Sequence, residues 1–190
     1  TPLSSSAASD VYKRQVPSDC DLLVLGEMGI SNTTSASAIS CALFNEPVTN
    51  MTGIGTGLNK NQLSKKIEII NNALKLHGKN FKDPISILSC YGGREIAAIA
   101  GSVISARLKS IPVLLDGFIC TAAASSLILF DKMLLDHCRI SHLSSEQGHA
   151  IVLRNLKMEP ILDLNLRLGE GSGAAIASLI LRAALATHNG

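Results

Sequence analysis

Short apolar runs alternate along the chain with longer segments whose apolar positions recur at helical spacing. The runs at 22–25, 84–89 and 111–115 are bounded by turn residues and predict buried strands, and 133–137 is a candidate fourth strand. Helices are expected over about 32–44, 59–77, 95–108, 120–130, 146–156 and 171–187, and 160–168 has a mixed pattern.

The order strand, glycine turn, helix recurs, which is typical of a parallel sheet covered by helices. We therefore predict an α/β fold, with a three-layer, mostly parallel Rossmann-like sheet and helices on both faces. With 46% hydrophobic but only 3% aromatic residues, helices must pack through small side chains. Ligands of such folds bind beyond the carboxyl ends of the strands. The less common residues there are Glu27, Gly93, Asp116, Ser144 and Glu170.

The first fifteen of the 190 residues, TPLSSSAASDVYKRQ, lack apolar periodicity and a signal-peptide core. They resemble translated library sequence, so residues 1–15 are predicted to be a non-native leader. Residues 16–190 are then expected to form part of one α/β domain.

Charge, hydropathy and cysteine content bear on nucleic-acid binding, membrane insertion, compartment and metal binding. A net charge of +2 gives no broad basic face, so no nucleic-acid partner is expected. The apolar stretch 111–130 is interrupted by Asp116-Gly117, which argues against a membrane span. Five widely spaced cysteines without a CxxC pair predict reduced thiols, a cytoplasmic location and no metal site.

Two glutamates stand between glycines, in Gly26-Glu27-Met28-Gly29 and in Gly169-Glu170-Gly171. A glutamate in an apolar cleft can serve as a general base, although each could instead be an ordinary residue of a turn or a helix start. The repeated setting favours one shared cleft.

Anion-binding signals accompany these turns. Asn32-Thr33-Thr34 opens a helix whose free backbone N–H groups favour phosphate. The loop 53–57 (GIGTG) lets backbone approach a ligand but is not the dinucleotide fingerprint, and it could equally be a flexible connection. Lys66 on the next helix either reaches a phosphate or belongs to a solvated face.

The segment 142–149 (HLSSEQGH) offers two histidines and two serines. A metal site is improbable at this spacing, and a serine nucleophile lacks the G-x-S-x-G elbow. Ser144 or Ser145 could cap the next helix and hold a phosphate there.

Six segments together resemble the nicotinate-nucleotide–dimethylbenzimidazole phosphoribosyltransferase family. They occur in the family's order and cover the carboxyl-terminal half of a family member. The segments are LGEMGISNTTSASAI (25–39), TGIGTGL (52–58), GGREIAAIAGSVISA (92–106), IPVLLDGFICTAAA (111–124), SHLSSEQGH (141–149) and LDLNLRLGEGSGAA (162–175).

The resemblance implies transfer of phosphoribose from nicotinate mononucleotide to dimethylbenzimidazole, in synthesis of the lower ligand of cobalamin. It implies Glu170 as the general base, Glu27 as the second functional glutamate, no cofactor and no metal. It also implies small-molecule substrates and, at full length, a homodimer. Substrate contacts are expected at Gly29, Ser31, Asn32, Thr33, Gly55, Gly57, Lys66, Asp116, Gly117, Ser144 and Gly169.

The sequence departs from the family pattern at Ile54, where arginine is frequent. Leu143, Ser145 and Gln147 replace Arg, Ala and Pro of an H-R-S-A-E-P-G-H block. These changes leave Glu170 intact but bear on nucleotide affinity. Two alternatives remain: a non-catalytic nucleotide-binding module or inactive fragment of the same fold, and an NAD-dependent oxidoreductase, which the absence of GxGxxG disfavours.

Overall fold

The computed structural model describes residues 15–54 and 57–190. The predicted leader therefore lies outside the described residues except for Gln15, and so does Gly55. The first half of this region contains β1 (Leu23–Leu25), α2 (Asn32–Phe44), α3 (Val48–Met51), α4 (Lys60–His77), α5 (Pro84–Tyr91) and α6 (Arg94–Leu108). The second half contains β2 (Val113–Leu115), α7 (Phe118–Ser125), the 3-10 turns η1 (Ser126–Leu129) and η2 (Lys132–Leu135), β3 (Cys138–Ser144), α8 (Gln147–Leu156), β4 (Pro160–Leu166) and α9 (Ser172–Asn189).

Four strands form one sheet in the order β1-β2-β3-β4, and every neighbouring pair is parallel. Leu23 pairs with Val113, and Val113 pairs with Cys138. The parallel α/β fold predicted from the sequence is confirmed. Since all strands point the same way, the loops that follow them meet at one edge of the sheet.

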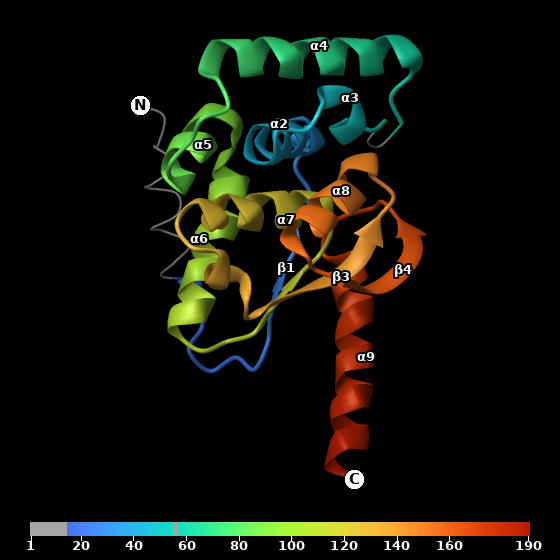
Figure 1. Ribbon diagram of the computed structural model, residues 1–190. Coiled ribbons are helices and arrows are strands. Elements are labelled where there is room, and N and C mark those ends of the chain that lie inside the picture. Colours follow the sequence, from blue (N-terminus) through green and yellow to red (C-terminus); the bar gives the residue numbers. More distant parts are fainter. Residues whose placement is uncertain (1–14, 55–56) are drawn as a thin grey trace.

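Helices lie on both sides of the sheet, but unequally (Figure 1). Val113 and Leu115 of β2 belong to the large core with α2, α6 and α7, whereas Leu114 packs with Ala174 and Ala177 of α9. This alternation follows from the period of two in a strand. On its second side the sheet meets α9 alone among the described helices, and α9 runs on beyond it to the C-terminus.

Small residues allow α2 to lie inside the larger core. Its buried residues include Ala36, Ser37, Ala38 and Ala42. The helix contacts α4, α5 and α7, and short side chains let all three approach closely. The small-residue packing expected from composition is therefore present.

Two strand predictions are wrong. The run at 84–89 forms α5, because Asp83 accepts a hydrogen bond from the Ser86 N–H (2.9 Å) and Pro84 occupies the first turn. The segment 133–137 begins as η2, capped by Asp131, and the strand starts only at Cys138. The mixed segment 160–168 provides β4.

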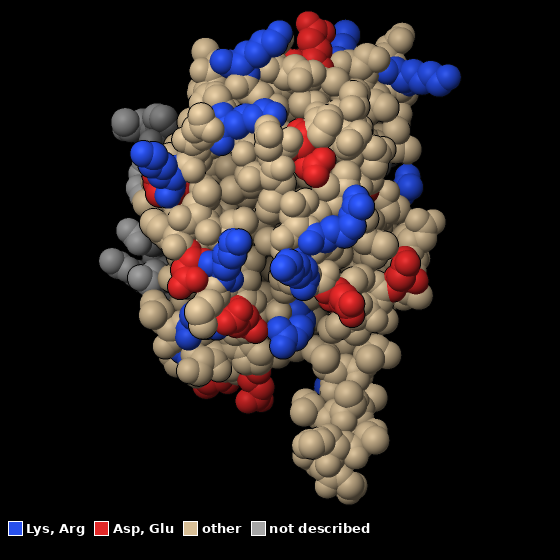
Figure 2. Space-filling model, in the orientation of Figure 1, with Lys and Arg blue, Asp and Glu red and all other residues tan. Residues whose placement is uncertain are grey.

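The apolar stretch 111–130 divides into β2, α7 and η1, as the turn at Asp116-Gly117 indicated. Across the described part of the chain, every helix falls short of the length or the apolar character that crossing a membrane requires. Figure 2 shows Lys and Arg interleaved with Asp and Glu on the visible face.

Candidate active site

A pocket of about 400 Å³ opens beyond the carboxyl ends of the four strands. Its walls come from the loops after β1, β2, β3 and β4 and from α2, α4 and α7. Of the residues predicted for the site, the pocket brings together Glu27, Gly29, Ser31, Asn32, Thr33, Lys66, Asp116, Gly117, Ser144, Gly169 and Glu170. Gly57 is described but does not line it, and Gly55 lies outside the described residues.

The first glutamate turn, residues 26–29, is closed by its own carboxylate. Glu27 Oε2 accepts hydrogen bonds from the Gly29 N–H (2.8 Å) and from Asn32 Nδ2 (2.6 Å). A side chain on Gly29 would meet the Asn32 amide, which would have to move aside. The Glu27 carboxylate thus ties the end of β1 to the start of α2.

The second glutamate turn has a different construction. Gly169, Glu170 and Gly171 all have positive φ (80°, 59° and 76°), a conformation that costs a non-glycine residue free energy. Glu170 is exposed. In the described part of the chain its carboxylate has no hydrogen-bond or ion-pair partner, so it remains available to a ligand.

The two turns touch through their backbones. The Glu170 N–H donates to the Glu27 carbonyl oxygen (2.8 Å). A side chain on Gly26 would overlap the backbone of Gly171. The shared cleft expected from the repeated motif is therefore present.

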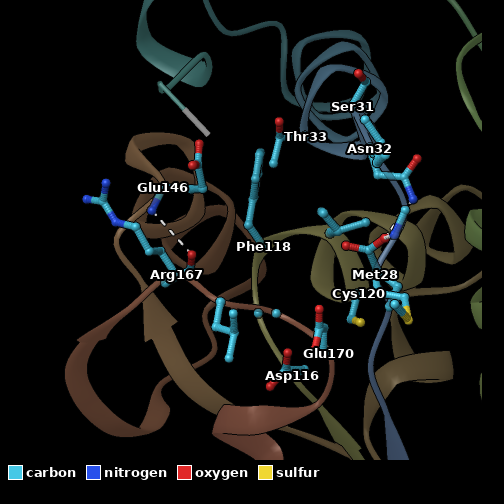
Figure 3. A pocket seen from close by; sticks show the side chains of 18 of the residues that line it. Met28, Ser31, Asn32, Thr33, Asp116, Phe118, Cys120, Glu146, Arg167 and Glu170 are labelled. Carbon is cyan, nitrogen blue, oxygen red and sulfur yellow. Dashed lines mark hydrogen bonds between the residues drawn. The ribbon is translucent and has the colours of Figure 1, made fainter. Parts of the chain in front are cut away.

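Asp116 forms the floor beneath the second turn and is 2% exposed. Its Oδ2 accepts from the Gly171 N–H (3.1 Å) and its Oδ1 from the Ala174 N–H (2.9 Å). Figure 3 shows Asp116 and Glu170 side by side at one end of the pocket, with Thr33 and Glu146 at the other.

The opposite end of the pocket combines the start of α2 and Lys66 with the buried carboxylate of Glu146. α2 begins after Ser31 (φ 70°), which makes no side-chain cap; the Thr34 N–H donates to the Ser31 carbonyl (2.9 Å), and the N–H groups before it can face an anion. Lys66 Nζ donates to Thr33 Oγ1 (2.8 Å) and to the Gly53 carbonyl (3.3 Å). Burial lowers the pKa of the Lys66 ammonium, and Glu146 opposes that shift.

The Ser144 side chain bonds to the backbone two residues further along the chain. Its hydroxyl accepts from the Glu146 N–H (3.2 Å), while α8 begins after Glu146 without a side-chain cap. The expectation that Ser144 or Ser145 caps α8 is therefore wrong, because the chain turns for two further residues before the helix starts. Ser144 still lies in the pocket wall.

Both histidines of this segment are buried, and His142 also lines the pocket. His149 Nδ1 accepts from the Ser144 N–H (2.9 Å), and its Nε2 lies 3.0 Å from Thr121 Oγ1. Burial lowers the pKa of His149 to about 3, so it stays neutral. Among residues 15–54 and 57–190 no cluster of His, Cys, Asp and Glu could hold a metal ion.

The sequence reasoning did not assign several wall residues. Phe118 and Cys120 reach the pocket from the start of α7, and Arg167 from the loop before α9. Glu146 is 9% exposed, and within the described structure its Oε2 has no hydrogen-bond partner. Glu146 stands inside the segment 142–149, and a buried position for it could have been inferred only from the tertiary fold.

Comparisons with known proteins bear on the family and the fold. A family model described as "Phosphoribosyltransferase" matches residues 4–190. The nicotinate-nucleotide–dimethylbenzimidazole phosphoribosyltransferase of Ruegeria sp. is 51% identical over 90% of this chain and 50% of its own length. That of Brucella canis is 46% identical over the same shares.

A solved structure is also similar. The crystal structure of CobT from Thermus thermophilus superposes with a TM-score of 0.87 at 37% identity, over 95% of this chain and 54% of that one. The chain thus spans about half the length of the curated relatives it matches. Because the family model covers almost the whole sequence, the chain belongs to the nicotinate-nucleotide–dimethylbenzimidazole phosphoribosyltransferase family.

Proposed function

We propose that this protein transfers phosphoribose from nicotinate mononucleotide to 5,6-dimethylbenzimidazole, giving α-ribazole 5′-phosphate and nicotinate. The observation that carries the proposal is the polarity of the pocket. An unpaired carboxylate, Glu170, stands at one end, and a helix N-terminus with Lys66 stands at the other. The curated relatives named for this reaction support the choice of substrates.

The end formed by the start of α2 and Lys66 receives the phosphate. The open N–H groups of α2 favour a dianion, and Lys66 has N–H capacity left beside its two acceptors. Thr33 holds the ammonium in place. Between the ends, Phe118 offers an apolar surface to the ribose and the rings.

The negative end carries out the proton transfer. The carboxylate of Glu170 takes the N–H proton of the azole while the other ring nitrogen attacks C1′. The bond from C1′ to nicotinate breaks, and its electron pair neutralises the pyridinium. Attack from the opposite face inverts C1′. Because the leaving group already carries positive charge, its departure requires no Lewis acid.

Apolar side chains rim the negative end. Met28 is 76% exposed and Leu168 is 68% exposed, and both line the pocket next to a glutamate turn. They provide a surface for the apolar face of dimethylbenzimidazole.

We also propose a cytoplasmic homodimer: the free cysteines favour a reducing compartment, and exposed Leu179 and Leu185 on α9 favour self-association.

The test is release of nicotinate, measured by chromatography, in the longest protein that the gene encodes. Glu170→Gln should lower the rate of release about 10²- to 10⁴-fold, and Glu159→Gln, at an exposed glutamate ahead of β4, should not alter it. Calorimetric titration with nicotinate mononucleotide distinguishes the enzyme from a protein that only binds the nucleotide. Binding without release from any azole would identify a non-catalytic nucleotide-binding module.

A further inference from the structure

The backbone of Asp116 is held by both neighbouring strands, β1 and β3, independently of the contact that its side chain makes with α9. Its N–H donates to the Leu25 carbonyl of β1 (3.0 Å), and its own carbonyl accepts from the Ser141 hydroxyl of β3. The side chain is 2% exposed. Asp116 is therefore a fixed point at the carboxyl end of the sheet.

The carboxylate of Asp116 is already engaged. Each oxygen accepts one backbone N–H from the first residues of α9, at 3.1 Å from Gly171 and 2.9 Å from Ala174. The cap residue of α9 is Gly171, which has no side chain. A carboxylate from another strand thus supplies the cap that the helix lacks, and its charge suits the positive end of the helix dipole.

The segment that Asp116 holds is the one that carries Glu170. Glu170 lies between Gly169 and Gly171, and all three residues have positive φ. A left-handed conformation in a glutamate persists only where its surroundings impose it. Glu27 fixes the N–H of Glu170, and Asp116 fixes the N–H of the next residue.

His142 closes the space behind this contact. Its Nδ1 lies 3.6 Å from Asp116 Oδ1, and its ring fills the room left by Gly173 and Gly117. A side chain on Gly173 would overlap the imidazole. The Asp116 carboxylate consequently has little freedom to turn towards a substrate.

We propose that Asp116 is a positioning residue that holds the Glu170 carboxylate in its reactive orientation through the start of α9. The inference rests on the proposed function of Glu170. It replaces the expectation that Asp116 binds substrate through its side chain.

The test is Asp116→Asn, which keeps the shape but turns one accepting oxygen into an N–H₂ group facing a backbone N–H. We expect kcat for nicotinate release to fall about 10- to 100-fold, because small misplacement of a catalytic group is costly. KM for nicotinate mononucleotide should stay within about 3-fold. In a Glu170→Gln background the same change should have no further effect on rate.

Asp83→Asn is the control, because Asp83 also caps a helix with its carboxylate, accepting from the Ser86 N–H at the start of α5, at residues that do not line the pocket. It should lower thermal stability while leaving kcat unchanged. Ser141→Ala removes the hydroxyl that holds Asp116 and keeps all charges. It should lower kcat by a smaller factor, so the proposal stays testable if Asp116→Asn folds poorly.

Amide hydrogen exchange at 171 and 174 separates this inference from the proposed function. Asp116→Asn should accelerate exchange there and Asp83→Asn should not, whether or not the protein releases nicotinate. Unchanged exchange overturns the inference, and so does a raised KM with unchanged kcat, which would make Asp116 a substrate contact. An equal rate loss with and without Glu170 overturns it too.

Discussion

The two glutamate turns share a sequence pattern but differ in what their carboxylates do. Glu27 is half-buried, and its Oε2 accepts two hydrogen bonds from its own turn and from α2. Glu170 is exposed, and within residues 15–54 and 57–190 its carboxylate accepts none. Glu170 has a positive φ of 59°, and Glu27 is not among the described residues with positive φ.

The difference shows that the same motif can provide structure in one copy and reactivity in the other. A carboxylate oxygen that already accepts two N–H groups, as Glu27 Oε2 does, has fewer lone pairs left for a substrate proton. One that lacks such partners keeps its lone pairs for a substrate proton. The strain at Glu170 is sustained by the Glu27 carbonyl and by Asp116, both of which bind backbone N–H groups.

The largest expected effect is a difference between the Glu170 and Glu27 variants in the rate of nicotinate release. Glu170→Gln removes the proton acceptor and should lower kcat for nicotinate release about 10²- to 10⁴-fold. Initial rates over a range of azole concentrations measure it. If Glu27→Gln reduced the rate more than Glu170→Gln, the assignment of roles would have to be exchanged.

The next effect tests the backbone contact between the turns. Gly26→Ala places a methyl group against the backbone of Gly171, which cannot move aside. We expect a loss of about 1–3 kcal/mol in the free energy of unfolding, measured by urea denaturation. Gly29→Ala should cost less, because its new methyl group meets the movable Asn32 side chain.

A third variant should increase, not decrease, the free energy of unfolding. Glu170→Gly relieves the left-handed strain and should raise the free energy of unfolding by about 1 kcal/mol, even though it abolishes activity. Glu170→Ala is the control, since it removes the same carboxylate but keeps the strain. Equal stabilities of the two variants would show that the turn is unstrained.

The smallest effect concerns the engaged glutamate. The two donors share Oε2, so Glu27→Gln can keep an accepting amide oxygen for both while losing the charge, and stability should fall by only about 0.5–1.5 kcal/mol. Nicotinate release should decrease less than about 10-fold, because the variant loosens the turn without removing the base. A complete loss of release would indicate that Glu27 takes part in the chemistry.

Local signals in the sequence predicted much of the fold. The helix expected over 32–44 has those bounds. The helix expected over 59–77 is α4, which begins after the Asn59 cap and ends before Gly78, where local capping bonds form. The strands near 22–25 and 111–115 are also present. The apolar run at 84–89 was misassigned because a buried strand and a short buried helix look alike, and the Asp83 cap decides between them.

The sequence by itself determined the parallel α/β class, the placement of unusual residues after strands and, through six matching segments, the family. Those properties depend on local periodicity and on motifs that neighbouring residues complete. Only the tertiary structure decided which glutamate is free: Glu27 Oε2 is held by its own turn and by Asn32, whereas the Glu170 carboxylate lines the pocket without a partner among the described residues. The contact of Asp116 with α9 joins residues 55 and 58 positions apart, and a hydrogen bond at that range exists only after the strands have paired.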